Sequence, residues 1–203
     1  MSRQVGAVVL AGGRSSRFGA DKLTAELAGR PLLDHVLAAV AAVDPDIEVV
    51  VAAAPGVDRP LPDGARLVAD PHAFGGPLAG LSSGLAALDP AVDVVIAVGG
   101  DMPWLVPAVL RRMLDILATD RATDIVALDD DGQPRPLPLA LRRAPASAAA
   151  TDLLATGDHR LRGLFPRLRT TTLPGATWRA LDPDGATIRD VDTPADLAEH
   201  PRP

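Results

Sequence analysis

Cysteine is absent from the 203-residue sequence. Disulfide scaffolds, cysteine-ligated zinc sites, iron–sulfur clusters and thiol nucleophiles are therefore excluded. A chain of this length buries roughly 70% of its unfolded surface on folding, so its core needs no disulfide or structural metal. The absence of cysteine also fits a protein that works in a reducing compartment.

Aromatic residues are scarce, at 2% of the chain, and tyrosine is missing altogether. So few rings cannot build the stacking platform on which single-stranded nucleic acids bind, and a net charge of −6 opposes binding to a polyanion. No apolar run approaches the roughly 18–20 residues of a membrane span, and the N-terminal run is too short for a signal peptide. We therefore expect no nucleic acid partner, no membrane and a cytoplasmic location.

Lysine is nearly absent. Of the 20 basic residues, only Lys22 is a lysine and the others are arginines. A compact ammonium and a planar guanidinium differ in hydration, reach and hydrogen-bond geometry. The single lysine by itself is explained either by drift in an arginine-rich chain or by a role that arginine performs badly, and its position beside a glycine-rich segment favours the second explanation.

What the sequence does contain alternates between aliphatic runs and amphipathic stretches. A continuous apolar run, typical of a strand buried on both faces, occupies residues 5–10, and segments rich in aliphatic residues predict further strands over residues 47–53, 66–69 and 92–98. Apolar residues at helical spacing and early prolines predict helices over residues 31–43, 77–88 and 104–117. This alternation predicts a three-layer α/β/α sandwich around a mostly parallel, doubly wound, Rossmann-like sheet.

The second half of the chain is less regular. Two aliphatic runs, over residues 124–128 and 136–141, flank Asp129-Asp130-Asp131-Gly132, which predicts a hairpin with a solvated acidic tip rather than a metal cluster. Helices are predicted over residues 144–156 and 159–168, with a short last helix near Pro194. No repeat or long linker divides the chain, so we expect a single domain over residues 1–203.

Ligands of an open α/β sheet bind beyond the carboxyl ends of its strands, and the first such segment is a basic, glycine-rich loop over residues 10–22. Backbone N–H groups of such a loop can surround phosphate oxygens, and Arg14, Arg17 and Lys22 add positive charge. The loop has neither the P-loop spacing nor the Gly-x-Gly-x-x-Gly fingerprint of dinucleotide-binding proteins. The second mismatch argues against a nicotinamide-dependent dehydrogenase.

Three later segments place carboxylates at the same edge of the predicted sheet. Asp101 follows a strand and two glycines, which suits either a ligand of Mg²⁺ or a helix cap. Asp70 ends another strand, and Gly76 begins a helix whose N-terminus can face an anion or a base. Near the C-terminus, Asp190 and Asp192 offer either a second carboxylate for the metal or, for Asp192, a helix cap.

Together these segments resemble nucleotidyltransferases with a Rossmann-like fold and, within that group, molybdenum cofactor guanylyltransferases. The resemblance runs from Val5 to Leu197 and rests on four motifs, which are Leu10-Ala11-Gly12-Gly13-x-Ser15-x-Arg17-Phe18-Gly19-x-Asp21-Lys22, Gly76-Pro77-Leu78-Ala79-Gly80, Gly100-Asp101-x-Pro103 and Asp192-Thr193-Pro194-x-Asp196-Leu197. The chain departs from the family pattern at Phe18, where Met is usual, at residues 51–54, which lack an Asn, and at Asp192, where Asn is frequent.

The resemblance implies a Mg²⁺-dependent transfer of GMP from GTP to the phosphate of molybdopterin that carries molybdenum, with release of pyrophosphate. It implies metal binding by Asp101, catalytic roles for Lys22, Asp101 and Arg17, and an acceptor-side position for Asp192. The nucleotide-binding residues that it implies are Leu10, Ala11, Gly12, Gly13, Lys22, Asp70, Gly76 and Asp101. Proteins that supply molybdopterin and chaperones of molybdoenzymes are the expected transient protein partners.

Several alternatives stay open at this point. A molybdopterin cytidylyltransferase, or a guanylyltransferase for another small phosphorylated acceptor such as phospholactate, would keep the fold and the mechanism. The sequence Ala11-Gly12-Gly13 resembles the guanine-using branch of the family. A nucleotide-binding partner protein without turnover is the alternative from another class, and the presence of both Lys22 and Asp101 opposes it.

Overall fold

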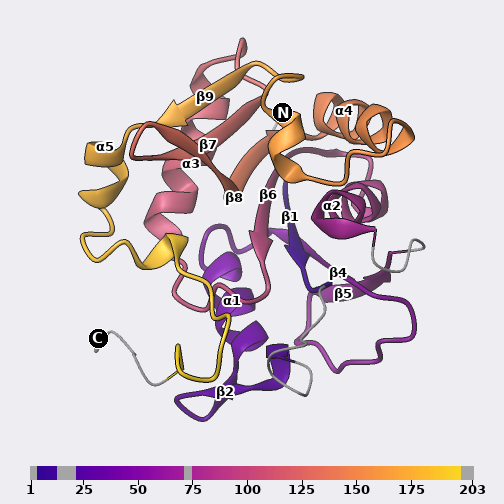
Figure 1. Ribbon diagram of the computed structural model, residues 1–203, viewed down its shortest axis with the longest axis vertical. Coiled ribbons are helices and arrows are strands. Elements are labelled where there is room, and N and C mark those ends of the chain that lie inside the picture. The colour runs from indigo at the N-terminus through magenta and orange to yellow at the C-terminus, as the bar shows by residue number, and fades with distance from the viewer. Residues whose placement is uncertain (1–3, 13–21, 71–74, 198–203) are drawn as a thin grey trace.

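The computed structural model describes residues 4–12, 22–70 and 75–197, and its centre is a seven-stranded sheet in the order β5-β4-β1-β6-β8-β7-β9 (Figure 1). The strands are β1 (Gln4–Leu10), β4 (Glu48–Ala53), β5 (Ala65–Ala69), β6 (Val92–Gly99), β7 (Ile125–Asp130), β8 (Gln133–Arg142) and β9 (Thr170–Leu173). Only β8 runs against the direction of the other strands of this sheet. The predicted mostly parallel, doubly wound sheet is therefore confirmed.

Helices cover both faces of the sheet (Figure 1). On one face, α1 (Leu32–Ala41) and α3 (Pro107–Thr119) share a core cluster, and on the other face α2 (Gly76–Ala87) and α4 (Arg143–Ala155) share a second cluster. Successive residues of β1 point to opposite faces, so Ala7 and Val9 enter the first cluster while Val8 and Leu10 enter the second. Within the described residues, no helix is both long and apolar enough to cross a membrane.

Gly84 allows α2 to lie close against β1. A Cβ atom at this position would lie 2.4 Å from Cγ1 of Val8, a distance that real Cβ atoms do not reach. The helix therefore packs directly on the strand whose end begins the glycine-rich loop, and the sequence marks this contact with a glycine in the middle of a helix.

The hairpin predicted around residues 129–132 joins β7 to β8. Asp131 and Gly132 both have positive φ angles, 51° and 79°, as a type I′ turn requires. Asp131 is exposed, but Asp130 is half-buried and lies 2.8 Å from Nη2 of Arg179. The turn prediction is confirmed, although an arginine, not solvent alone, balances the charge of Asp130.

Other predictions were wrong in extent. The helix expected over residues 104–117 begins only at Pro107, because Val106 is extended. Only the 3₁₀ helix η2 (Leu161–Leu164) forms within residues 159–168, since Pro166 has no amide hydrogen for a continuing helix. The helix expected near Pro194 is replaced by turns.

Several short elements escaped prediction. These are η1 (Lys22–Thr24), β2 (Glu26–Leu27), β3 (Arg30–Pro31), α5 (Gly175–Arg179), η3 (Ala186–Ile188) and the strand β9. All are five residues or shorter, so none is long enough to show a helical or alternating pattern of apolar residues.

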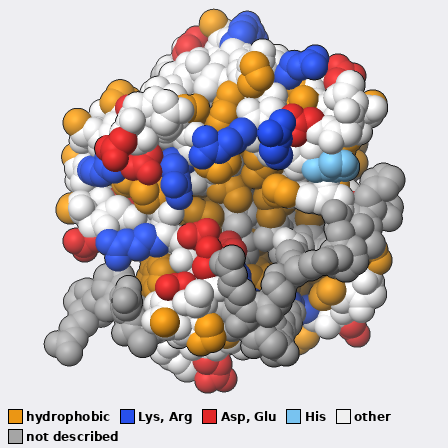
Figure 2. Space-filling model, viewed as in Figure 1, with side chains coloured by type: hydrophobic (Ala, Val, Ile, Leu, Met, Phe, Trp, Pro, Cys, Tyr) orange, Lys and Arg blue, Asp and Glu red, His pale blue; other side chains and the backbone are white. Residues whose placement is uncertain are grey.

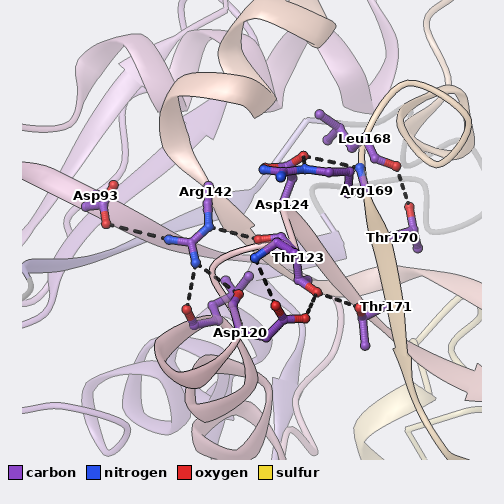
Figure 3. A network of polar contacts seen from close by, with 11 residues as sticks. Asp93, Asp120, Thr123, Asp124, Arg142, Leu168, Arg169, Thr170 and Thr171 are labelled. Carbon is purple, nitrogen blue, oxygen red and sulfur yellow. Dashed lines mark hydrogen bonds and ion pairs between the residues drawn. The ribbon is translucent and has the colours of Figure 1, made fainter.

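A polar network ties β7, β8 and β9 to the end of α3 (Figure 3). Arg142 donates to the carbonyls of Leu117 and Thr123, each at 2.8 Å. The guanidinium of Arg169 holds both carboxylate oxygens of Asp124, at 2.6 and 2.7 Å. Arg142 is the last residue of the antiparallel strand β8, and Asp124 comes just before β7. This network therefore lies at the amino ends of the parallel strands, whereas Asp101 follows the carboxyl end of β6.

Candidate active site

The carboxyl ends of β1, β4 and β6 lie side by side. Leu10 of β1 is level with Ala52 of β4 and with Gly99 of β6. The amide of Gly100 donates to the carbonyl of Leu10 at 2.9 Å, and the amide of Ala11 donates to the carbonyl of Ala52 at 2.8 Å. The start of the glycine-rich loop is therefore fixed between the two neighbouring strands.

Two glycines after β6 direct Asp101 back toward this edge. A Cβ atom on Gly99 would lie 2.5 Å from Oδ1 of Asp101, and one on Gly100 would lie 3.2 Å from the carbonyl oxygen of Leu10. Larger residues at these positions would displace either the carboxylate or the end of β1. The glycine pair is thus a requirement of the site's geometry.

Lys22 lies between two carboxylates that come from distant parts of the chain. Its Nζ is 2.8 Å from Oδ2 of Asp101 and 3.1 Å from Oδ1 of Asp192. Burial by itself lowers the pKa of the Lys22 ammonium, but hydrogen bonds and charge attraction from Asp101 and Asp192 outweigh that effect and raise the pKa. Lys22 is therefore fully protonated at neutral pH.

Asp190 joins Asp101 and Asp192 in a group of three carboxylates. One oxygen from each residue lies within 4.8 Å of the others. Desolvation, followed by the charges of Asp192 and Asp101, raises the pKa of Asp190. An oxygen-only donor set of this kind suits a hard divalent cation, which would also relieve the mutual repulsion of the carboxylates.

Burial of Val191 holds residues 190–192 of the C-terminal segment beside Asp101. Val191 is fully buried against Leu27 and Leu32, and its amide donates to the carbonyl of Asp101 at 2.9 Å. Its neighbours Asp190 and Asp192 consequently flank the end of β6.

Asp196 shapes the same segment. Its Oδ2 accepts hydrogen bonds from the amides of Asp192, at 2.8 Å, and Thr193, at 2.7 Å. The interpretation of Asp192 as a helix cap is therefore wrong, since Asp192 is itself held by Asp196 and its side chain pairs with Lys22. No role is predicted for Asp196 from the sequence, although it lies in the motif Asp192-Thr193-Pro194-x-Asp196-Leu197.

Asp70 and Gly76 lie on the other side of β1. Asp70 follows β5, is buried, and accepts a 3.4 Å hydrogen bond from the hydroxyl of Ser83. Gly76 begins α2 with a φ angle of +76°, and a Cβ there would lie 3.0 Å from both Cβ and the carbonyl oxygen of His159. The ring Nδ1 of His159 is also 2.7 Å from the carbonyl of Gly75, so this histidine, which sequence analysis missed, supports the start of α2.

Part of the predicted site lies outside the described residues. Gly13, Arg14 and Arg17 belong to residues 13–21, which the structure does not describe. Of the predicted positions that are described, Lys22, Asp101 and Asp192 meet directly. Leu10, Ala11 and Gly12 adjoin them through the end of β1.

Comparison with known proteins gives a consistent result. Residues 7–171 match the family model described as the MobA-like NTP transferase domain. The chain is 34% identical over 194 residues to a probable molybdenum cofactor guanylyltransferase of Chloroflexus aggregans, with 94% of this chain and 90% of that protein covered. It is 37% identical over 196 residues to a protein of the same description from Deinococcus radiodurans, with coverage of 95% and 92%.

A solved structure shows the same fold. The molybdopterin-guanine dinucleotide biosynthesis protein A of Archaeoglobus fulgidus superposes with a TM-score of 0.76 over 96% of this chain and 95% of that chain, at 20% sequence identity. A nucleotidyl transferase from Methanothermobacter thermautotrophicus superposes with a TM-score of 0.70 at 20% identity, over 98% and 96% of the two chains. At these identities the likeness concerns the fold alone.

Proposed function

Since this chain belongs to the MobA-like NTP transferase family, we propose that it transfers GMP from GTP to the phosphate of molybdopterin and forms the molybdopterin guanine dinucleotide. An oxygen of the acceptor phosphate attacks the α-phosphorus of GTP, the bond between the α-phosphorus and its bridging oxygen to the β-phosphorus breaks, and pyrophosphate leaves with the bonding electrons. The observation that carries the proposal is the contact of Lys22 with Asp101 and Asp192 at the carboxyl end of β6.

The reaction brings two phosphates together, so neutralising charge and fixing an in-line geometry are the main demands on the protein. The acceptor phosphate is already ionised at neutral pH, and the reaction therefore needs no general base. Lys22, protonated and held by two carboxylates, supplies a fixed positive charge toward the phosphates of GTP. Arg17 is proposed to add a second positive charge.

The nucleotide is proposed to bind along the ends of β1 and β5. Backbone groups of residues 10–13 would hold its phosphates and part of the nucleoside. Asp70 would contact the guanosine side, and the N-terminus of α2 at Gly76 would face the nucleotide. This placement is supported by the alignment of Leu10 with the ends of β4 and β6, which leaves the loop at the edge where ligands of such sheets bind.

The family uses a divalent metal ion, and we propose Mg²⁺ for this chain. Asp101, with Asp190 and Asp192 beside it, provides hard oxygen donors close enough to share one ion. Such an ion would neutralise phosphate charge and orient the α-phosphoryl group. Lys22 would then keep Asp101 and Asp192 oriented through its two ion pairs.

Two further expectations belong to the proposal. A cytoplasmic location and transient contact with molybdopterin-supplying proteins or molybdoenzyme chaperones fit an acceptor that is a labile cofactor. The single nucleotidyltransferase domain over residues 1–203 likewise stays a prediction.

Calorimetric titration of GTP, CTP and ATP into the purified protein with Mg²⁺ tests the nucleotide site. We expect GTP to bind more tightly than CTP by at least about tenfold, and Lys22→Ala and Asp101→Asn each to weaken GTP binding. The exposed Arg112→Gln on α3 is the matched control and should leave binding unchanged. Equal or stronger binding of CTP would contradict the assignment of GTP, and failure of a folded wild-type protein to bind any nucleotide would contradict the proposed function.

A further inference from the structure

Two of the three carboxylates, those of Asp190 and Asp192, belong to a segment over residues 182–192 that forms no strand of the central sheet. Its regular structure is limited to η3 (Ala186–Ile188). In Figure 1 this part of the chain, drawn in yellow, passes beside the end of β6, and Figure 2 shows acidic side chains gathered in the same region. The positions of its carboxylates relative to Asp101 therefore depend on the contacts that hold the 182–192 segment.

Thr187 ties this segment to the start of α3. Thr187 is fully buried, and its hydroxyl oxygen accepts a 3.1 Å hydrogen bond from the amide of Val106. Val106 comes just before α3, so its amide has no partner within the helix and needs one from elsewhere. Val106 also belongs to the connection between β6 and α3 that contains Asp101. Thr187 therefore holds the 182–192 segment against the part of the chain that carries Asp101.

Asp182 shapes the turn that presents Thr187. Its buried carboxylate accepts hydrogen bonds from the amide of Ala186, at 2.9 Å, and from the amide of Thr187, at 2.7 Å. Gly185 lies between them with a φ angle of +63°, in the left-handed region that glycine adopts readily. The position of the Thr187 hydroxyl is consequently fixed by its own backbone as well as by Val106.

Two further contacts hold the residues on either side of Asp190. The carbonyl of Ile188 accepts a 3.1 Å hydrogen bond from the guanidinium of Arg135, which lies on β8. The amide of Val191 donates to the carbonyl of Asp101 at 2.9 Å. Asp190 therefore lies in a stretch of the segment that is fixed at both ends.

Fixing the segment matters because the three carboxylates repel one another. One oxygen from each of Asp101, Asp190 and Asp192 lies within 4.8 Å of the others. Lys22 offsets part of this repulsion by pairing with Asp101 and Asp192. If the 182–192 segment were free to move, its two carboxylates would relieve the repulsion by moving away from Asp101. Ligands that are already held together bind a cation more tightly than ligands that must first be gathered.

We propose that Thr187 is a positioning residue for the divalent metal site. By tying the 182–192 segment to Val106, it keeps the two carboxylates of that segment within reach of an ion shared with Asp101. Hydrogen bonds that orient metal ligands from outside the coordination sphere typically change metal affinity roughly 10–100-fold. This inference rests on the metal site of the proposed function and adds the residue that keeps its ligands together.

Binding of Mn²⁺ to the purified protein without nucleotide, measured from the electron paramagnetic resonance signal of the free ion, tests this role. Thr187→Val keeps the size and branching of the side chain but removes the hydroxyl that accepts from Val106. We expect its Kd for Mn²⁺ to rise at least about tenfold. Thr187→Ser keeps the hydroxyl and should stay within about threefold of the wild-type Kd.

Thr123→Val is the matched control, because it also removes the hydroxyl of a buried threonine. Thr123 lies in the network at the amino ends of the parallel strands, where its hydroxyl contacts Asp120 and Thr171 at 2.6 Å each. We expect this variant to unfold at a lower urea concentration than the wild type but to keep the wild-type Kd for Mn²⁺. A wild-type Kd in Thr187→Val, or an equal loss of affinity in Thr187→Val and Thr123→Val, would overturn the inference.

Arg135→Gln loosens the segment from a partly exposed position, so it is less prone to misfolding than a change at a buried residue. It removes the donor to the carbonyl of Ile188. We expect it to weaken Mn²⁺ binding by more than about twofold but less than Thr187→Val does, because Val191 and Thr187 still hold the segment. If Thr187→Val does not fold, an unchanged Kd in Arg135→Gln overturns the inference.

The Mn²⁺ measurement uses neither GTP nor acceptor, so its outcome is separable from that of the proposed function. GMP transfer by the wild-type protein, with Mn²⁺ binding unaffected in Thr187→Val, would leave the proposed function standing and overturn the inference. No GMP transfer, with Mn²⁺ binding that depends on Thr187, would contradict the proposed function and support the inference. Failure of the wild-type protein to bind Mn²⁺ would overturn the inference, since Thr187 would then have no metal site to position.

Discussion

At the scale of single residues, the structure explains why arginine rather than lysine stands beside three helix ends. Arginine side chains cap the ends of helices by donating to several carbonyls at once: Arg111 does so at the end of α1, Arg142 at the end of α3 and Arg143 at the end of α2. One ammonium group cannot span such a set of acceptors. Lys22, in contrast, lies between the carboxylates of Asp101 and Asp192, where a compact ammonium group fits.

Replacing Lys22 by arginine tests this distinction. The Lys22→Arg variant keeps the positive charge but places a planar, bulkier group between Asp101 and Asp192, so the charge no longer lies where the phosphates meet. We expect kcat/KM for GMP transfer to fall roughly 100-fold while the fold is retained. The reverse exchange at an exposed site, Arg112→Lys, should leave kcat/KM unchanged. Wild-type activity of Lys22→Arg would show that the site needs charge alone.

Replacing an arginine that caps a helix end with lysine should lower the free energy of unfolding. Arg143 donates to the carbonyls of Leu85, Leu88 and Asp89 at 2.7–3.0 Å. In Arg143→Lys at least one of these acceptors loses its partner, and we expect the free energy of unfolding in urea to fall by about 1–2 kcal/mol. Arg112→Lys again serves as the control, and equal stability of the two variants would refute this capping role.

Among the site residues, those next to strands were predictable and those set by tertiary contacts were not. Lys22 and Asp101 lie in motifs that follow aliphatic strands, which is why the sequence pointed to them. The choice between a cap and a site carboxylate at Asp192 could not be made from sequence. It depends on burial of Val191 and on a contact that spans 170 residues.

At the scale of elements, the central strands were predicted well because their aliphatic runs are buried on both faces. The edge strand β9, with the sequence Thr170-Thr171-Thr172-Leu173, was missed since its polar β-branched residues form no apolar run. Its register depends instead on tertiary contacts, in which Ile125 to Leu128 of β7 pair with these residues and Asp124 holds Arg169.

The Asp124–Arg169 pair makes the attachment of β9 sensitive to acid. Hydrogen bonds from Arg169 lower the pKa of Asp124 in the folded protein. The stabilisation is therefore fully present above the unfolded pKa of about 3.9 and is lost as the pH falls through the lower folded value. We expect wild type to be more stable than Asp124→Asn at pH 7, with the difference shrinking below about pH 4. Urea unfolding at several pH values measures this, and a difference that does not change with pH would contradict it.

At the scale of the whole molecule, the site is assembled from the start, middle and end of the chain. Lys22 follows the first strand, Asp101 follows β6, and Asp190 and Asp192 return from the C-terminal segment. A doubly wound sheet brings such segments to one edge because its parallel strands end there together. The nucleotide proposed above would bind at this edge, on the side of β1, β4 and β5.

We propose that residues at this edge join the α-phosphate of GTP to an acceptor phosphate, and a label-transfer experiment distinguishes this reaction from others. Purified protein is incubated with Mg²⁺, molybdopterin and GTP that carries ³²P in either the α or the γ position, and the products are separated. We expect the α-label to enter the molybdopterin dinucleotide and the γ-label to leave as pyrophosphate, and we expect Lys22→Ala to abolish both. Transfer of γ-label to the acceptor, or no transfer of α-label by the wild-type protein, would contradict it.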